Sequence, residues 1–272
     1  VGAGTFGGNP VLNAVDSIGC PGANFIIIQG AGSSSTIIDP NTVNADGFQL
    51  ISTLTPVFVG GMKLKNSAGG GVGLYGNGPG VAFGLNGDIN FGAGWLNQIT
   101  STNNALCINF GTDYSISGGA TTHLRGDSGS FDMEVGTVTI TGTPAFSGAF
   151  FSGTGTLGSL YTNMTYSGSA TGTRFAMTNG AGLTILNSNY SSNNDLTHLP
   201  GNAAGTSDGS GNYNGIVLGN GGKQVGDLLT GMPKGTRDFV TNATATTFAS
   251  IVAGGGGNNV PVIYNGTNWI IG

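Results

Sequence analysis

A short pattern of hydrophobic and polar positions recurs along the middle of the chain. Each copy has an apolar residue, any residue, a second apolar residue, and then small polar residues or glycine. The second apolar position recurs about every 25 residues between Leu64 and Tyr190. Alternation with a period of two indicates β-strands, and strands that recur at a fixed spacing without helices between them indicate a coil of stacked strands. The copies begin at Met62, Ile89, Tyr114, Val138, Met164 and, weakly, Ser188.

The length of the repeat distinguishes between the known types of β-coil. Left-handed coils show a hexapeptide period, and leucine-rich repeats of roughly 20–29 residues carry a Leu-x-x-Leu-x-Leu signature. Neither pattern is present in this chain. We therefore predict an all-β fold, a right-handed parallel β-helix (a β-solenoid) with about 25 residues per turn, over residues 25–192.

The remaining segments predict a cap, a connection and a small β-module. Residues 1–24 are rich in glycine, proline and asparagine and are predicted to form an N-terminal lead-in that caps the coil. Residues 193–236 are predicted to be an irregular connecting region. In residues 237–272, an Asn-Gly pair between Tyr264 and Thr267 has apolar flanks and predicts a β-hairpin. This module would close the coil or mediate assembly, because an open strand edge readily pairs with another chain.

Composition excludes several classes of function. Charged residues make up 7% of the chain, against about 25% in ordinary soluble domains, and 54 of the 272 residues are glycine. The expected surface is a neutral coat of Ser, Thr, Asn and Gly. The seven basic residues form no patch, so we expect no nucleic-acid partner. No apolar run is long enough to cross a bilayer, so we expect no membrane insertion.

The two cysteines are predicted not to form a disulfide. Cys20 and Cys107 would lie about three turns apart in a 25-residue coil, which is roughly 14 Å at the spacing of stacked strands. A disulfide needs Cα atoms within about 7 Å. We expect both residues to be small buried side chains.

The densest group of charges runs from His123 to Glu134 and supplies the catalytic candidates. Asp132 and Glu134 are two apart on an expected strand, so both side chains should point to one face, about 6.6 Å apart at the backbone. Carboxyl groups of inverting glycosidases lie roughly 6.5–9.5 Å apart. Asp127 and Arg125 are expected on the preceding corner, where they would tune a pKa or bind an anionic sugar. The alternative is that all are solvent-facing charges without catalytic work.

Aromatic residues near the ends of turns supply the ligand-binding candidates. Trp95 and Tyr75 would stack on a sugar ring, with Arg125 as a polar contact. Alternatively, each ring packs against a neighbouring turn or a neighbouring subunit.

Other titratable groups give weaker signals. Asp195 can orient the imidazole of His198, but no nucleophile accompanies the pair. The two histidines are far apart, and Asp39 and Asp46 lack the Asp-x-Asp-x-Asp pattern of calcium loops. We predict neither a metal site nor a cofactor.

Two segments resemble parts of a known family. The stretch Phe25–Asp39, followed by Ala45–Phe48, resembles the opening turns of the pectate-lyase-like β-helices that are common in bacteriophage tailspikes and tail fibres. The segment Phe239–Trp269 is similar to the C-terminal segment of many phage and prophage tail proteins. The resemblance implies a homotrimer on the virion tail, in contact with other tail proteins and with a bacterial surface polysaccharide or lipopolysaccharide.

Three functions are consistent with these expectations. The first is adhesion to a bacterial surface glycan, which a neutral Asn/Ser/Thr coat favours because such groups bind sugar hydroxyls without desolvating a charge. The second is a polysaccharide depolymerase, a glycosidase or lyase, that uses Asp127, Asp132 or Glu134. The third is a purely structural virion or filament protein.

Overall fold

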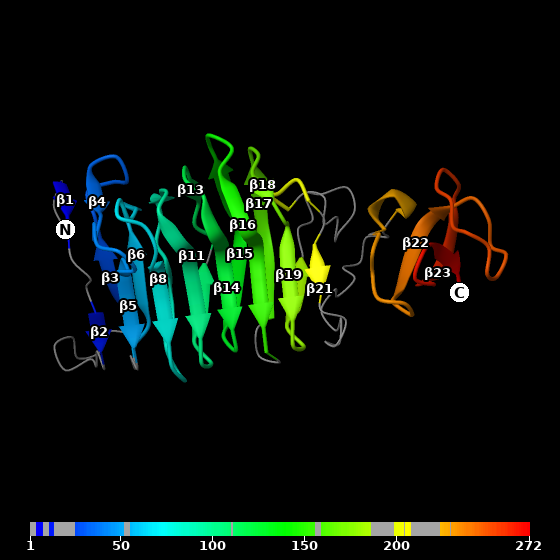
Figure 1. Ribbon diagram of the computed structural model, residues 1–272, viewed down its shortest axis with the longest axis horizontal. Helices are drawn as coiled ribbons and strands as arrows, with labels where there is room; N and C mark the ends of the chain where they lie inside the picture. Colours follow the sequence, from blue (N-terminus) through cyan, green and yellow to red (C-terminus); the bar gives the residue numbers. More distant parts are fainter. Residues whose placement is uncertain are drawn as a thin grey trace.

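The computed structural model describes residues 4–7, 11–13, 25–51, 55–109, 111–155, 159–185, 199–203, 205–207, 224–228 and 230–272. Figure 1 shows an elongated stack of strands with a small second sheet beyond its C-terminal end. Apart from one 3-10 turn, η3 (Val225–Asp227), the regular elements of these residues are β-strands. The predicted all-β class is confirmed.

Most strands belong to three parallel stacks, which we call stacks A, B and C. Stack A contains β1 (Gly4–Phe6), β4 (Thr36–Ile38), β7 (Met62–Leu64), β10 (Ile89–Phe91) and β13 (Tyr114–Ile116). Stack B contains β2 (Val11–Asn13), β5 (Phe48–Ile51), β8 (Val72–Asn77), β11 (Trp95–Thr102), β14 (Ala120–Asp127), β16 (Ala145–Thr154), β18 (Thr171–Gly172), β19 (Phe175–Thr178) and β21 (Thr206–Ser207).

Stack C contains β3 (Ile26–Gln29), β6 (Val57–Gly60), β9 (Ala82–Leu85), β12 (Leu106–Asn109) and β20 (Gly182–Ile185). Two long strands, β15 (Ser130–Ile140) and β17 (Ser159–Ser167), run through both stack C and stack A and join them into one 12-stranded sheet. Each strand pairs in parallel with the equivalent strand of the next turn. The predicted β-solenoid is therefore confirmed.

The register agrees with the sequence repeat until its fifth copy. Leu64, Phe91, Ile116 and Ile140 occupy equivalent positions in successive turns of stack A. In the next turn, however, Tyr166 pairs with Val138 instead of Ile140. The reason is a register shift between Met133 and Gly136, where β15 carries one residue more than β17. The copy that begins at Ser188 lies outside the described residues.

Inward-pointing ladders of apolar side chains form a single continuous core inside the solenoid. Each ladder residue is nearly or fully buried, which contributes roughly 1.5–3 kcal/mol per large side chain. Cys107 lies in the stack C ladder and is buried, as predicted, whereas Cys20 falls outside the described residues. The stack B ladder consists of Leu74, Ile99, Leu124, Phe151 and Phe175, and the stack C ladder of Val57, Phe83, Cys107, Phe131 and Leu160.

The solenoid is longer at both ends than the predicted range of 25–192. Strands β1 and β2 pair with β4 and β5, so part of the expected lead-in already belongs to the stacks. Strand β21 pairs with β19 beyond the expected end of the coil. These strands contain only two or three residues, too few to display an alternating pattern in the sequence.

The C-terminal module is a three-stranded antiparallel sheet of β22 (Arg237–Ala243), β23 (Asn258–Tyr264) and β24 (Trp269–Ile271). The predicted hairpin is confirmed: Tyr264 pairs with Trp269, and Asn265 Oδ1 accepts hydrogen bonds from the backbone N–H groups of Thr267 and Asn268. The module has its own core, centred on Val240 and Val262, which is separate from the core of the solenoid.

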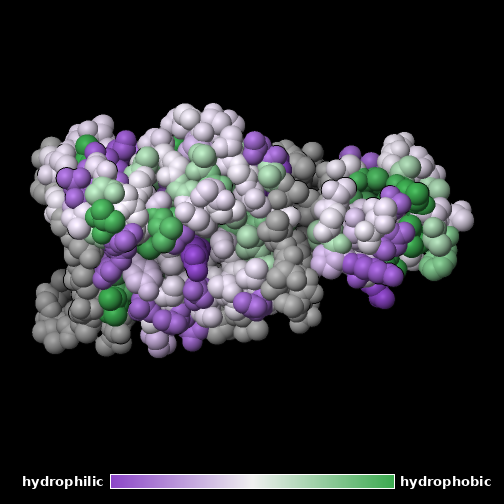
Figure 2. All heavy atoms as spheres, viewed as in Figure 1, coloured by the Kyte–Doolittle hydropathy of each residue, from purple (hydrophilic) through white to green (hydrophobic). Residues whose placement is uncertain are grey.

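The exterior has the neutral character that the composition predicts. On the side seen in Figure 2, pale spheres of intermediate hydropathy cover most of the solenoid, with scattered hydrophilic and hydrophobic groups between them. Among the described residues, no helix has both the length and the apolar character needed to cross a membrane.

A buried carboxylate connects two turns at the corner after β4. Asp39 accepts hydrogen bonds from the backbone N–H and the hydroxyl of Ser67, at 2.9 and 2.6 Å, and its Oδ2 lies 3.0 Å from Lys65 Nζ. Burial alone would raise the pKa of Asp39, but these hydrogen bonds and the charge of Lys65 lower it to about 2.

We predict that this brace gives acid-sensitive stability. A lowered pKa stabilises the fold above the ordinary aspartate pKa, and that contribution is lost as pH falls from about 4 to about 2. Asp39→Asn should therefore cost about 2 kcal/mol of unfolding free energy at pH 7, measured by urea denaturation. The difference from wild type should shrink as pH approaches 2, and an equal difference at both pH values would contradict this role.

Candidate functional site

Three of the six candidate residues lie on the outer surface of stack B. Tyr75, Thr100 and Arg125 pair with one another on β8, β11 and β14, so they form one outward row across successive turns. Figure 1 shows these three strands side by side. The neighbouring positions, Ile99 and Leu124, are fully buried in the core. The solenoid register thus brings Tyr75 and Arg125 to the same face, although they are 50 residues apart in the sequence.

A second outward row lies two residues further along the same strands. Asn77 pairs with Thr102, and Asp127 pairs with Thr154. The rows are in contact, because the Thr102 hydroxyl donates to Tyr75 Oη at 3.3 Å. We call the six side chains the polar flank; they are Tyr75, Asn77, Thr102, Arg125, Asp127 and Thr154.

The charges of the polar flank remain accessible to a ligand. Arg125 Nη2 lies 3.7 Å from Asp127 Oδ2, and the two side chains are 42% and 46% exposed. An exposed pair of this kind contributes little to stability. Between Tyr75 and Arg125, the Thr100 hydroxyl is buried without a hydrogen-bond partner in the described part of the chain. Buried polar atoms are normally paired, so an orphan hydroxyl commonly marks a water or ligand position.

The predicted catalytic residues do not share one face. Asp132 and Glu134 alternate with the buried Phe131 and Met133 on β15, so both point outward, as expected. Asp127, in contrast, ends β14 in stack B, and the chain turns the corner immediately afterwards at Ser128, which has a φ of 53°. The prediction that Arg125 and Asp127 lie on this corner is wrong, because β14 continues through both.

Trp95 is not available to bind a sugar. The side chain is only 3% exposed, and its indole N–H donates to the Leu64 carbonyl at 3.1 Å. The ring fits against the backbone of Gly47 and Gly73, where any larger residue would leave it no room. The alternative interpretation, a ring packed between turns, is the correct one.

His123 belongs to the interior and not to the charged group in which the sequence places it. Its Nε2 lies 2.8 Å from the hydroxyl of Tyr114, and its Nδ1 lies 2.7 Å from Gln98 Oε1. Because Gln98 Oε1 can only accept, Nδ1 carries the proton and Nε2 accepts from Tyr114. Gln98 Nε2 in turn donates to the Gly118 carbonyl at 2.7 Å. We call Gln98, His123 and Tyr114 the interior network.

Sequence reasoning missed this network, although a signal for it exists. Gln98 and His123 are 25 residues apart, which is one repeat, so they lie in adjacent turns. Around them, Phe91, Phe146 and Phe150 have ring centroids 4.7–6.2 Å from the imidazole. Burial lowers the pKa of His123 to about 3, so the ring is neutral at physiological pH.

The weaker candidates give no metal site in the described part of the chain. Asp195 and His198 lie outside it. Asp39 braces a corner, and Asp46 accepts hydrogen bonds from Gln49 and from the Val72 backbone N–H. The described residues contain no group of three or more His, Cys, Asp or Glu side chains that could hold a metal ion.

Comparison with known proteins gives no family. No family model, no curated protein and no solved structure matches the chain. The resemblance to phage tail proteins therefore stays a prediction, and the geometry of the solenoid surface carries the functional argument.

We predict that the interior network makes stability fall between pH 6.5 and about 3. In this range the unfolded chain protonates His123 and the folded chain does not, so the free energy of unfolding should decrease by about 1.4 kcal/mol for each unit of pH lost. His123→Gln should remove this one-proton slope in urea denaturation measured across the range. An unchanged slope in the variant would show that His123 is protonated in the folded protein.

Proposed function

We propose that the protein is an adhesion component of a bacteriophage or prophage tail, a fibre or tailspike protein. It binds a bacterial surface polysaccharide or lipopolysaccharide through the polar flank. The observation that carries the proposal is the alignment of Tyr75, Arg125 and Asp127 with amide and hydroxyl side chains on one face of an elongated solenoid.

The chemistry of the polar flank suits a glycan. The Tyr75 ring offers an apolar surface to a sugar face, and the Arg125–Asp127 pair offers a donor and an acceptor 3.7 Å apart. Asn77 and Thr102 add neutral hydrogen-bonding groups, which are released from water at a lower cost than charges. Successive turns repeat these groups every ~4.8 Å, so a linear polysaccharide can contact several turns at once.

The sequence resemblance supports the remaining parts of the proposal. It favours a place on the virion tail, contacts with other tail proteins and a homotrimer. The C-terminal module is the part of the chain most similar to phage tail proteins, and it carries exposed apolar side chains that an assembly contact would cover, namely Phe239, Phe248 and Ile251.

A depolymerase is the second candidate function. It is favoured by the outward carboxylates of Asp132 and Glu134, which lie two residues apart on β15. Asp127 lies in another stack and is not part of this pair. A purely structural role in a virion or filament is the third candidate, and it requires no ligand.

We predict that Tyr75→Ala and Arg125→Ala each weaken glycan binding at least tenfold, because each removes one contact of the polar flank. The measurement is binding of the wild type and variants to an array of bacterial polysaccharides and lipopolysaccharides. Lys63→Ala is the matched control, since Lys63 is an outward basic residue on stack A and should leave binding unchanged.

Two outcomes would redirect the proposal. Binding that is equal in all variants would exclude the polar flank as the adhesion site. Release of new reducing ends from the bound glycan, abolished by Asp132→Asn or Glu134→Gln, would support the depolymerase instead.

We also predict that the chain is a trimer in solution. Light scattering coupled to size-exclusion chromatography should give about three times the chain mass of 27.0 kDa. A monomer at micromolar concentration would contradict the trimeric tailspike.

A further inference from the structure

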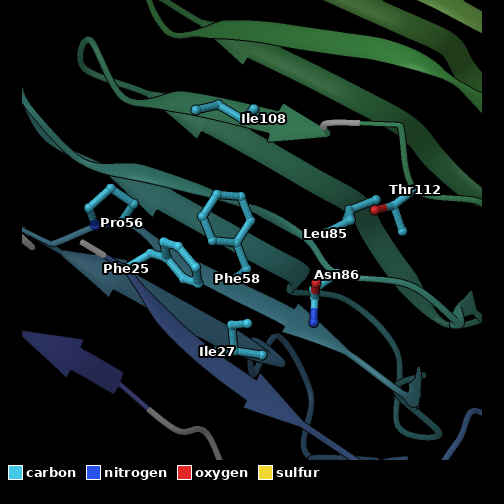
Figure 3. Close-up of a pocket in the computed structure, with 8 residues that line it drawn as sticks. All are labelled: Phe25, Ile27, Pro56, Phe58, Leu85, Asn86, Ile108 and Thr112. Atoms are coloured by element: carbon cyan, nitrogen blue, oxygen red, sulfur yellow. The ribbon is translucent and has the colours of Figure 1, made fainter. Parts of the chain in front are cut away.

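An apolar groove lies on the outer surface of stack C, on a different stack from the polar flank. Its volume is about 470 Å³, within the range of roughly 300–1,000 Å³ that is typical of small-molecule sites. Figure 3 shows Phe25, Ile27, Phe58 and Ile108 along the groove, with Asn86 and Thr112 at one side.

The groove exists because one position of an outward row has no side chain. Ile27, Phe58, Gly84 and Ile108 pair in succession on β3, β6, β9 and β12. Gly84 leaves a gap between Phe58 and Ile108, and a Cβ atom there would lie 1.9 Å from the Ile108 carbonyl oxygen. Phe25 packs edge to face on Phe58, with ring centroids 6.0 Å apart.

Apolar surface in this groove is exposed to an unusual extent for so small an area. Phe25 is 52% exposed and Ile27 is 45% exposed, whereas large apolar side chains of the solenoid core are buried. Exposed apolar patches on otherwise polar surfaces commonly mark binding sites.

The same row ends in a carboxylate without a counter-charge. Asp132 pairs with Ile108 and follows it on the next turn, roughly 4.8 Å away. Glu134 points outward two residues further along β15. Neither carboxylate has an ion-pair or hydrogen-bond partner among the described residues, where the ion pairs are Lys65–Asp39 and Arg125–Asp127. A positive charge beside this groove must therefore come from a ligand.

We propose that the groove binds a small organic cation, an amine joined to an aromatic or alkyl group. The apolar group fills the gap above Gly84, between Phe58 and Ile108. The ammonium group reaches Asp132, which lies two strands from Gly84, or roughly 9.6 Å at the spacing of parallel strands. An aromatic ring with a chain of about four carbons spans nearly this distance.

Three probes with the same apolar part and different charge test the proposal. They are 4-phenylbutylamine, 4-phenylbutanol and 4-phenylbutyrate, titrated into the full chain with ¹³C-labelled isoleucine methyl groups. The methyl resonances of Ile27 and Ile108 should shift with all three probes, because both side chains line the groove. The amine should bind at least fivefold more tightly than the carboxylate.

Variants separate the two parts of the site. Asp132→Asn should make the amine bind no better than the alcohol, whereas Asp238→Asn, a carboxylate removed in the C-terminal module, should change nothing. Ile27→Asn should weaken binding of all three probes, and Ile27 is exposed enough for the chain to fold without it.

Clear results would overturn the proposal. Equal affinity for amine and carboxylate would remove the role of Asp132, and unshifted methyl resonances would remove the groove. Shifts that depend on protein concentration without any probe would show that a second copy of the chain covers the groove instead. Because the readout is local to stack C, it stands apart from glycan binding on stack B.

Discussion

The in-register parallel pairing of equivalent strands is the constraint on which the rest of this structure depends. Side chains alternate along a strand, so one aligned pair fixes which residues of both turns face inward. Once Leu64, Phe91 and Ile116 are aligned in stack A, the outward positions between them are aligned as well. Both proposed sites follow from this geometry. The polar flank and the row above the groove are columns of residues that are distant in sequence and adjacent in space.

The interior of the solenoid must also satisfy the polar groups that its corners bury. Asn66 is nearly fully buried, and its Nδ2 lies at hydrogen-bond distance from the carbonyls of Thr42, Ala45 and Gly70. The interior network serves the same end for Gln98, His123 and Tyr114, whose polar atoms bind one another inside an aromatic shell. Buried polar groups are stable only when they are paired. For this reason we assign His123 to the fold and not to chemistry.

The sequence predicted the features that repeat and missed those that depend on local geometry. The repeat from Met62 to Ile140 and the hairpin after Tyr264 are properties of short segments, and both are confirmed. The shifted pairing of Tyr166 follows from one extra residue in β15, which no period reveals in advance. Trp95 was misplaced because a ring at the end of a turn can point either way. For the candidate site, spacing along one strand correctly placed Asp132 beside Glu134, but it could not place Asp127 relative to the corner.

The scarcity of charge makes each outward charged residue informative. In a chain with 7% charged residues, the described ion pairs hold Asp39 with Lys65 and Asp127 with Arg125. The carboxylates of Asp132 and Glu134 are the outward acidic groups of β15 and have no such partner in the described residues. A selection for solubility alone would not need them beside an apolar hollow, since Ser and Thr already coat the rod. Their position next to Ile108 is therefore better explained by recognition of a ligand than by the stability of the solenoid.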